Sequence, residues 1–386
     1  MNTMAPTLRH RLPSARKIWL QTHLWLGLTA GFLLALIGLT GSVLVLNDQL
    51  LRIEVGDIFD VAGPIPSQPA VDQWIANARR AYGDLELGFV LGPGFGPTGN
   101  AAVLGAVGAG NTHWLITIDS NSGLPLGNYI WEDRFATFVL RLHASLGASG
   151  GWLSWGRDAL AWLGVAMMVL MATGLYLWWP RNRNWYIALT LKRGARGRRR
   201  LLDLHNLFTV YLYVPLFILA ATGVYFLRPD WIDPTISLVS VERTPDPGAL
   251  AQVSKPGACP ARTTPGQAAA LALARYPSSR LAAVVIPSAQ DQPLVVQLAP
   301  PDNFGLKGQT QVYIDPVCPI ILTVLDREAA VAAETFKAIV HPLHFNLMLG
   351  RLGQAIVFLA GLILPLSWVT GLLLWLDKRK NRKRSA

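Results

Sequence analysis

Four segments of this 386-residue chain are apolar over a length that crosses a lipid bilayer. A helix needs about 20 consecutive apolar residues to span the hydrocarbon core, and each segment reaches that length with its few charges near an end. The chain is 52% hydrophobic and only 15% charged, which excludes an ordinary soluble protein. We therefore predict a membrane protein with transmembrane helices at 19–47, 157–179, 206–228 and 353–376.

Three short polar segments hold most of the positive charge, and they indicate the orientation of the chain. These segments contain 18 of the 34 lysines and arginines but only two acidic residues. Because positive charge stays on the cytoplasmic side, we expect both termini in the cytoplasm and both long segments outside. The net charge of +11 then reflects topology and does not indicate a nucleic-acid partner. The expected cytoplasmic parts are 1–18, 180–204 and 377–386, and the expected outer lobes are 48–150 and 229–350.

The order of motifs indicates one unit written twice. The first and third apolar segments share the pattern His-x16-Thr-Gly, which begins at His23 and at His205. The second and fourth contain "MATGLYLWWP" and "SWVTGLLLWLD", and a Leu-His pair precedes each of these segments. We therefore expect two duplicated pairs of transmembrane helices.

Each outer lobe also shows the same order of predicted elements. The stretches "VDQWIANARRAYG" and "TPGQAAALALARYP" have the periodicity of amphipathic helices. Each precedes two alternating stretches around an Asp turn, followed by a helix, in "HWLITIDSNSGLPLGNYIWEDRF" and "QVYIDPVCPIILTVLDREAAV". The predicted fold class is a membrane α-helical protein with four transmembrane helices and an outer α/β head of two lobes.

Two features of the outer lobes invite a cofactor or metal interpretation. The stretch "GFVLGPGFGPTGNAAVLGAVGAGN" lacks both GxGxxG between a strand and a helix and GxxxxGK[ST], so we interpret it as a flexible hairpin or a substrate-contacting loop. Cys259 and Cys318 lack the CxxC spacing of zinc and iron–sulfur sites. They lie in the second outer lobe, where a disulfide is favoured over two free thiols.

Four of the seven histidines occupy two matched pairs of positions. His23 and His205 begin outgoing helices at the cytoplasmic side, and His143 and His344 precede returning helices at the outer side. One such histidine is usually an interfacial side chain, but matched pairs favour a shared ligand. Two imidazoles from facing helices can fill both axial positions of a haem, which then transfers electrons. We predict an inner haem between His23 and His205 and an outer haem between His143 and His344.

Other roles for the histidines have less support. No Asp, Glu or Cys accompanies the pairs, whereas structural zinc normally has four protein ligands. His341 and His344 are three residues apart and offer a surface metal site, or His341 replaces His344 as the outer ligand, but Pro342 between them disfavours regular helix. His10 and His113 have no matched partner and are expected in solvent or in the lobes.

Small and aromatic residues fit the same membrane interpretation. Glycines in the apolar segments allow helices to approach closely or make room for a flat macrocycle. Five tryptophans near the ends of these segments are expected to form an interfacial belt. They are Trp178, Trp179, Trp185, Trp368 and Trp375.

Nearly the whole chain resembles the PepSY-associated transmembrane helix family. The stretches that carry the resemblance are "THLWLGLTAGFLLALIGLTGSVLVL", "LRLHASLGASGG", "DLHNLFTVYLYVPLFILAATGVYF" and "HPLHFNLMLGRLG". Within the family, the chain is most similar to inner-membrane ferrisiderophore reductases of Gram-negative bacteria, including the ferrioxamine-associated type. His23, His143, His205 and His344 occupy the matching motif positions.

The resemblance implies a fold, an activity and partners. It implies periplasmic PepSY-like lobes, two b-type haems, and reduction of Fe(III) in a siderophore, with the hydroxamate type expected, to Fe(II) at the periplasmic face. Because the chain stops ten residues after the last helix and lacks the fused flavin reductase domain of some relatives, we expect quinol or a separate protein as electron donor. The rivals are a non-enzymatic PepSY binding or regulatory module on a membrane anchor, and a siderophore transporter, which unbroken helices would disfavour.

Overall fold

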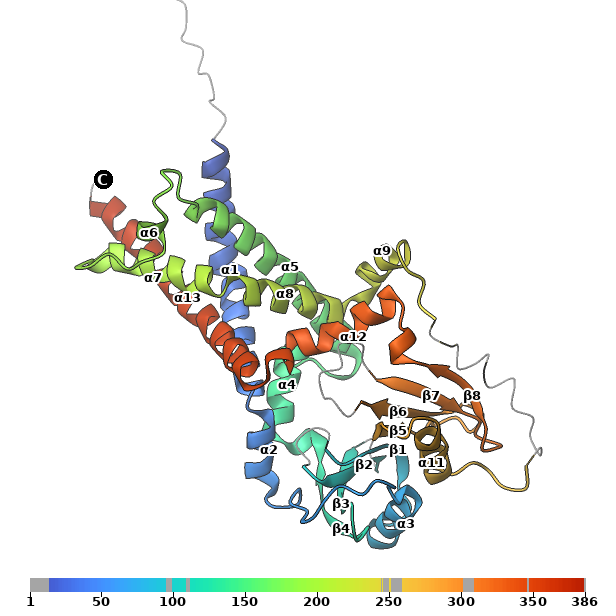
Figure 1. The fold of residues 1–386 in the computed structure, drawn as a ribbon. Helices are drawn as coiled ribbons and strands as arrows, with labels where there is room; N and C mark the ends of the chain where they lie inside the picture. The colour runs from blue at the N-terminus through green and yellow to red at the C-terminus, as the bar shows by residue number, and fades with distance from the viewer. Residues whose placement is uncertain are drawn as a thin grey trace, which may run out of the picture. The chain divides into compact units, whose positions relative to one another are not determined.

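The computed structural model describes two compact units, which we call the membrane unit and the head unit. The membrane unit comprises residues up to 42, 143–227 and 355 onward, and the head unit comprises 43–142 and 228–354. Each unit is formed by segments that are far apart in the sequence, as the colours in Figure 1 show. The described residues are 14–94, 99–108, 112–243, 245, 250, 259–300, 309–345 and 347–384.

Three helices of the described residues are long and apolar enough to cross a membrane, and a bent pair adds a fourth span if it counts as one. The three are α1 (Ala15–Leu44), α5 (Leu153–Trp178) and α13 (Gly350–Arg384). The pair consists of α7 (Gly197–Tyr211) and α8 (Tyr213–Leu227). The sequence therefore located all four apolar segments, and the structure extends several of the boundaries.

The third predicted span is not one continuous helix. The axes of α7 and α8 differ in direction by 63° at a break next to Leu212. Pro215 explains the break, because its ring excludes the carbonyl of Tyr211, four residues earlier, and it has no N–H to donate. The expectation that no membrane helix is broken, which weighed against a transporter, is wrong.

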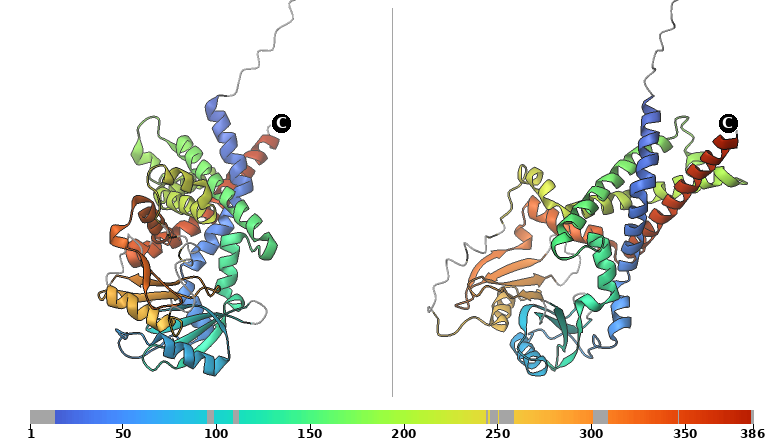
Figure 2. Two further views of the ribbon diagram at one scale, coloured as in Figure 1. Left: turned by 90° about the vertical axis from the view of Figure 1, so that its right-hand side faces the viewer. Right: turned by 180° about the vertical axis from the view of Figure 1, so that it is seen from behind.

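Glycines allow the membrane helices to pack closely. The α1 and α13 helices cross (Figure 2), and a Cβ at Gly38 would reach 2.5 Å from the carbonyl oxygen of Gly361. Ser42 Oγ donates to the carbonyl of Phe358 at 2.8 Å across the same contact. Backbone therefore meets backbone at this contact, as small residues permit in a bilayer.

Trp368 does not belong to the predicted interfacial belt. Its indole packs against the middle of α1, where a Cβ at Gly31 would lie 2.9 Å from its Cδ1, and its ring centroid lies 5.4 Å from that of Phe32. The space left by Gly31 admits the ring. Trp178, Trp179 and Trp185 do form an aromatic cluster with centroids 5.1 to 6.5 Å apart.

The head unit is built on one antiparallel sheet of eight strands in the order β4-β3-β2-β1-β5-β6-β7-β8 (Figure 1). The two predicted lobes meet where β1 pairs with β5, with Phe89 opposite Val285 and Leu91 opposite Ala283. The lobes therefore share a single sheet. The strands are β1 (Glu86–Leu91), β2 (Ala101–Val107), β3 (His113–Asp119), β4 (Pro125–Ile130), β5 (Arg280–Val285), β6 (Leu294–Ala299), β7 (Thr310–Ile314) and β8 (Ile321–Leu325).

Two amphipathic helices pack on this sheet and close the core of the head. Helices α3 (Val71–Tyr82) and α11 (Pro265–Arg275) bury Trp74 and Ala268 against strand residues such as Ile116 and Val284. At the start of α3, Asp72 accepts hydrogen bonds from Thr264 Oγ1 at 2.6 Å and from the N–H of Gly266 at 2.8 Å. These bonds tie the two helices together. Both helices were predicted from periodicity, as were the strand pairs β3–β4 and β7–β8 but not β5–β6.

Shorter helices connect the elements named so far. The α-helices are α2 (Asn47–Val55), α4 (Phe135–Ser145), α6 (Trp185–Ala188), α9 (Asp233–Ser237) and α12 (Ala332–His344). The 3-10 helices are η3 (Trp131–Asp133), η4 (Gly150–Trp152), η5 (Pro229–Trp231), η6 (Arg327–Ala329) and η7 (Leu347–Leu349). Helix α12 continues through Pro342, although a proline between His341 and His344 disfavours regular helix.

Two further expectations for the head have an outcome. Cys259 and Cys318 form a disulfide, as favoured from their position. The glycine-rich stretch contributes residues 88–91 to β1 and 101–107 to β2, which pair antiparallel as a hairpin, so the hairpin interpretation is confirmed. Residues 95–98 and 109–111 of that stretch lie outside the described residues.

Candidate functional site

The structure brings the predicted inner pair of histidines together. His23 on α1 and His205 on α7 both belong to the membrane unit, and their ring centroids lie 6.3 Å apart with the ring planes at 89°. Two imidazoles that bind one metal ion through a ring nitrogen at about 2 Å place their centroids about 6 Å apart. The observed separation therefore fits a pair of rings that share one ion.

Each histidine of the membrane unit is held by a threonine from a different helix. His23 Nδ1 lies 2.9 Å from Thr173 Oγ1 of α5. The corresponding distance from His205 Nδ1 to Thr370 Oγ1 of α13 is 3.0 Å. Nδ1 of each ring is therefore engaged, and Nε2 is the nitrogen that remains for a ligand.

His143 is held in the same way, at the end of α4. Its Nδ1 lies 3.1 Å from Thr40 Oγ1 of α1 and 3.0 Å from the carbonyl oxygen of Ile37. The same second contact occurs at His205, whose Nδ1 lies 3.0 Å from the carbonyl oxygen of Ser367. A main-chain carbonyl one turn before the threonine therefore shares the ring N–H at both positions.

A glycine follows each of these three threonines and allows the imidazole to approach. A Cβ built on Gly41 would lie 3.0 Å from His143 Cε1, and one on Gly174 would lie 3.1 Å from His23 Cε1. The corresponding distance from Gly371 to His205 Cε1 is 3.3 Å. Contacts of 3.0 to 3.4 Å are tighter than nine in ten real Cβ contacts. Each Thr-Gly pair thus forms a cradle for the edge of a ring, and we call these pairs the Thr-Gly cradles.

These residues fit a bis-histidine haem on the chemistry of the donor set. Neutral imidazole is a common axial ligand of haem iron, and ligating histidines usually donate their other ring N–H to an oxygen. Among the described residues, no three His, Cys, Asp or Glu side chains gather in a way that could hold a metal ion. A haem needs only two axial ligands from the protein, because its macrocycle supplies the other four.

The predicted outer pair is divided between the two units. His143 belongs to the membrane unit, and His344 belongs to the head unit as the last residue of α12. The ring of His344 lies 5.6 Å from that of Phe345, and the ring of His341 lies 4.5 Å from the same phenyl group. The pairing of His143 with His344, and the choice between His344 and His341, stay predictions.

The remaining two histidines are not part of this arrangement as far as the structure describes them. His113 at the start of β3 forms an ion pair with Glu132 in the head unit, as a lobe residue is expected to do. The interaction lowers the pKa of Glu132, since the imidazole and a main-chain N–H both donate to its carboxylate. His10 lies outside the described residues.

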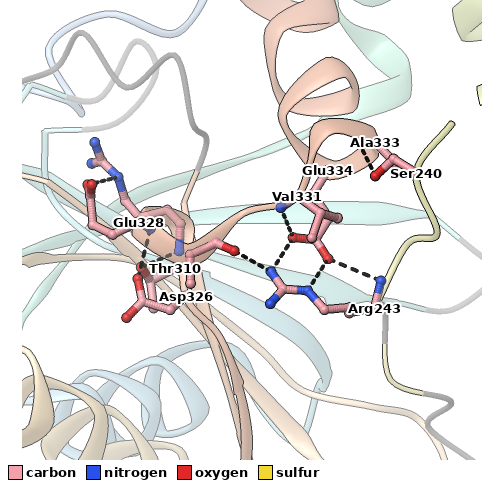
Figure 3. Close-up of polar contacts among 10 residues, drawn as sticks. Ser240, Arg243, Thr310, Asp326, Glu328, Val331, Ala333 and Glu334 are labelled. Atoms are coloured by element: carbon pink, nitrogen blue, oxygen red, sulfur yellow. Dashed lines mark hydrogen bonds and ion pairs between the residues drawn. The ribbon is translucent and has the colours of Figure 1, made fainter.

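The helix that carries His341 and His344 is anchored at its start by an ion pair. Glu334 in the first turn of α12 accepts from Arg243, with Nη2 to Oε2 at 2.8 Å and Nε to Oε1 at 3.1 Å (Figure 3). Its Oε2 also accepts the N–H of Val331 at 3.1 Å. The Arg243 guanidinium is the main cause that lowers the pKa of Glu334 to about 2. Glu334 is thus ionised at neutral pH and caps α12.

A comparison with known families matches almost the entire chain. The model of the PepSY-associated TM region matches residues 20–378. The chain belongs to the PepSY-associated TM family. No curated protein matches the chain. The range matched by the PepSY-associated TM region includes all four predicted ligands, His23, His143, His205 and His344.

The threonines are the site residues that the motif analysis missed. The sequence showed a Thr-Gly pair seventeen residues after His23 and after His205, and that interval suggested only a common depth in the membrane. In the structure, neither histidine uses the pair on its own segment, since Thr173 and Thr370 hold them from other helices. The available signal was that Thr-Gly occurs once in each of the four apolar segments.

Proposed function

We propose that this protein is an inner-membrane dihaem b-type reductase that moves electrons across the membrane and reduces a ferric siderophore to Fe(II) in the periplasm. The observation that carries the proposal is the 6.3 Å separation between the ring centroids of His23 and His205. Nδ1 of each ring is hydrogen-bonded to a threonine. An anchor for a binding domain does not need two facing imidazoles inside an apolar helix bundle.

The four histidines have defined roles in this proposal. His23 and His205 hold the inner haem, and His143 holds the outer haem together with His344. Haem with two imidazole ligands supplies a one-electron couple and leaves no open coordination position. Apolar side chains such as Leu34 and Met171 form a buried cluster in the same membrane unit.

The substrate class rests on the family resemblance and on the chemistry of iron. Hydroxamate oxygens are hard ligands that hold Fe(III) far better than Fe(II), so one-electron reduction releases the metal. A haem held by His143 and His344 would supply one electron to the ferric siderophore, a transfer that needs no covalent intermediate and no proton-transfer residue. Quinol or a separate protein supplies electrons at the cytoplasmic side.

The first test is the visible spectrum of the full chain purified in detergent from haem-replete cells. We expect a sharp Soret band, split visible bands on reduction, and two haems per chain. Colourless protein from such cells would rule out the reductase and favour the PepSY binding or regulatory module.

Single histidine variants test the pairing of the ligands. We expect His23→Ala and His205→Ala each to remove the inner haem, and His143→Ala and His344→Ala each to remove the outer haem. His113→Ala in the head is the matched control and should retain both, because His113 contacts Glu132 outside the site. Loss of the outer haem from His341→Ala, with retention in His344→Ala, would transfer the ligand role to His341.

Substrate reduction is tested anaerobically on protein reduced beforehand with a limiting amount of dithionite. Addition of a ferric hydroxamate siderophore should reoxidise the haems and release Fe(II), which a ferrous chelator detects. Haem that stays reduced with every ferric siderophore would contradict the substrate class while leaving transmembrane electron transfer intact.

A further inference from the structure

We propose that the Thr-Gly cradles position the haem ligands by fixing one imidazole tautomer and by strengthening Nε2 as an electron donor to iron. This inference rests on the proposed function, since it assigns a role to residues that act through the ligands. The threonines are positioning residues, because they contact the histidine and not the haem iron.

The direction of each Thr–His hydrogen bond follows from the single proton of the hydroxyl group. Thr173 Oγ1 donates to the carbonyl oxygen of Val169 at 2.8 Å, within its own helix. Thr370 Oγ1 likewise donates to Leu366 O at 2.8 Å, and Thr40 Oγ1 to Ile37 O at 2.9 Å. A hydroxyl whose proton is used in this way offers only lone pairs to the imidazole. The ring nitrogen Nδ1 must therefore be the donor.

The contacts with main-chain carbonyl oxygens independently indicate that Nδ1 is the hydrogen-bond donor. Ser367 O and Ile37 O can only accept, and each lies 3.0 Å from the Nδ1 of a histidine. A neutral imidazole carries one proton, so a protonated Nδ1 leaves Nε2 with its lone pair. His205, and His23 through its bond to Thr173, therefore present the nitrogen that a metal ion requires.

The acceptor oxygens also set the strength of the ligand. A ring that donates its N–H to an oxygen gains electron density at the other nitrogen and becomes a stronger donor to iron. A stronger donor stabilises Fe(III) over Fe(II) and lowers the reduction potential of the haem. Loss of the threonine oxygen should therefore raise that potential.

Thr-Gly occurs a fourth time, at Thr222-Gly223 in α8. Thr222 Oγ1 donates to the carbonyl oxygens of Ile218 at 2.6 Å and Leu219 at 3.3 Å, the same back-bonds that the other three threonines make.

The test compares three variants of the full chain. Thr173→Val has nearly the shape of threonine but no acceptor oxygen, and Thr173→Ser retains the oxygen. Thr29→Val is the matched control, because Thr29 makes the same back-bond, to Trp25 O at 2.8 Å, on the exposed face of α1. The readouts are haem content, the midpoint potential of each haem in a spectroelectrochemical titration, and the low-spin electron paramagnetic resonance spectrum.

We expect Thr173→Val to raise the midpoint potential of one haem, to shift one low-spin signal, and to weaken retention of that haem about tenfold. Thr173→Ser and Thr29→Val should match the wild type. If Thr173→Val has the wild-type potential and spectrum, or if Thr173→Ser shifts as far as Thr173→Val, the cradle proposal is wrong. A wild-type protein without haem would instead overturn the proposed function, which separates the two failures.

Discussion

At the scale of single residues, His23 and His205 are each held by a threonine from another helix. His23 and His205 are conspicuous because an ionisable side chain in an apolar helix is costly. A threonine in such a helix is ordinary, since its hydroxyl can bond to the carbonyl four residues earlier. Only the packing of helices shows that Thr173 and Thr370 also contact a histidine.

The glycine of a cradle is testable by adding one methyl group. In Gly174→Ala the new Cβ would lie 3.1 Å from His23 Cε1, so the ring must shift by a few tenths of an ångström. We expect reduced content of the inner haem and a changed low-spin signal, with an overpacking cost of about 1–3 kcal/mol. The measurement is haem per chain by pyridine haemochrome.

Gly27→Ala is the control for this substitution. Its Cβ would make an ordinary contact of 3.7 Å with Leu170 Cδ2 in the same membrane unit. Equal haem loss in both variants would mean that the bundle tolerates no added volume, and the cradle would then have no special role.

At the scale of elements, local rules explain where helices begin and end. Helix α7 ends at Tyr211, four residues before Pro215. This end is predictable from the sequence, because the proline ring clashes with the carbonyl four residues earlier and proline has no N–H to donate. The ion pair at the start of α12 is not predictable from the sequence, because Arg243 lies 91 residues before Glu334. Periodicity describes one segment at a time and carries no information on such a distant partner.

The ion pair at the start of α12 predicts a pH dependence of stability. The pKa of Glu334 falls from an ordinary value of 4.5 to about 2, so its contribution is fully present above pH 4.5 and is lost as the pH falls toward about 2. We expect Glu334→Gln to lower the unfolding temperature at pH 7, and the difference from wild type should shrink below pH 4.5.

The measurement is thermal unfolding of the full chain in detergent, followed by circular dichroism from pH 7 to pH 3. Glu328→Gln is the control, since the Glu328 side chain is 65% exposed and should contribute little. A Glu334→Gln difference that stays constant down to pH 3 would contradict the assigned pKa.

At the scale of the whole molecule, the sequence predicted the inventory of elements better than their assembly. Both amphipathic head helices, the β1–β2 hairpin, the pairs β3–β4 and β7–β8, and the disulfide were anticipated, but strands β5 and β6 were not. The joining of two lobes into one sheet was not, because β1 and β5 each resemble an ordinary strand and their pairing spans almost 200 residues. The pairing of His143 with His344 stays a prediction, because it also joins residues that are far apart in the sequence.

The predicted topology is tested with reporter fusions to the intact membrane segments. Alkaline phosphatase fused after Gly147 or after Ser240 should be active, and green fluorescent protein fused after Ala386 should fluoresce, because positive charge retains both termini inside. Active phosphatase at the C-terminus would reverse the orientation and place the head in the cytoplasm.

The single sheet of the head also constrains the order in which the protein can be made. Strand β1 finds its partner β5 only after the intervening segments, including α5, α7 and α8, have been synthesised. Until then the first lobe presents an unpaired strand edge, which is where a growing chain is most prone to wrong pairing. The first lobe therefore cannot complete its share of the sheet until β5 of the second lobe has been synthesised.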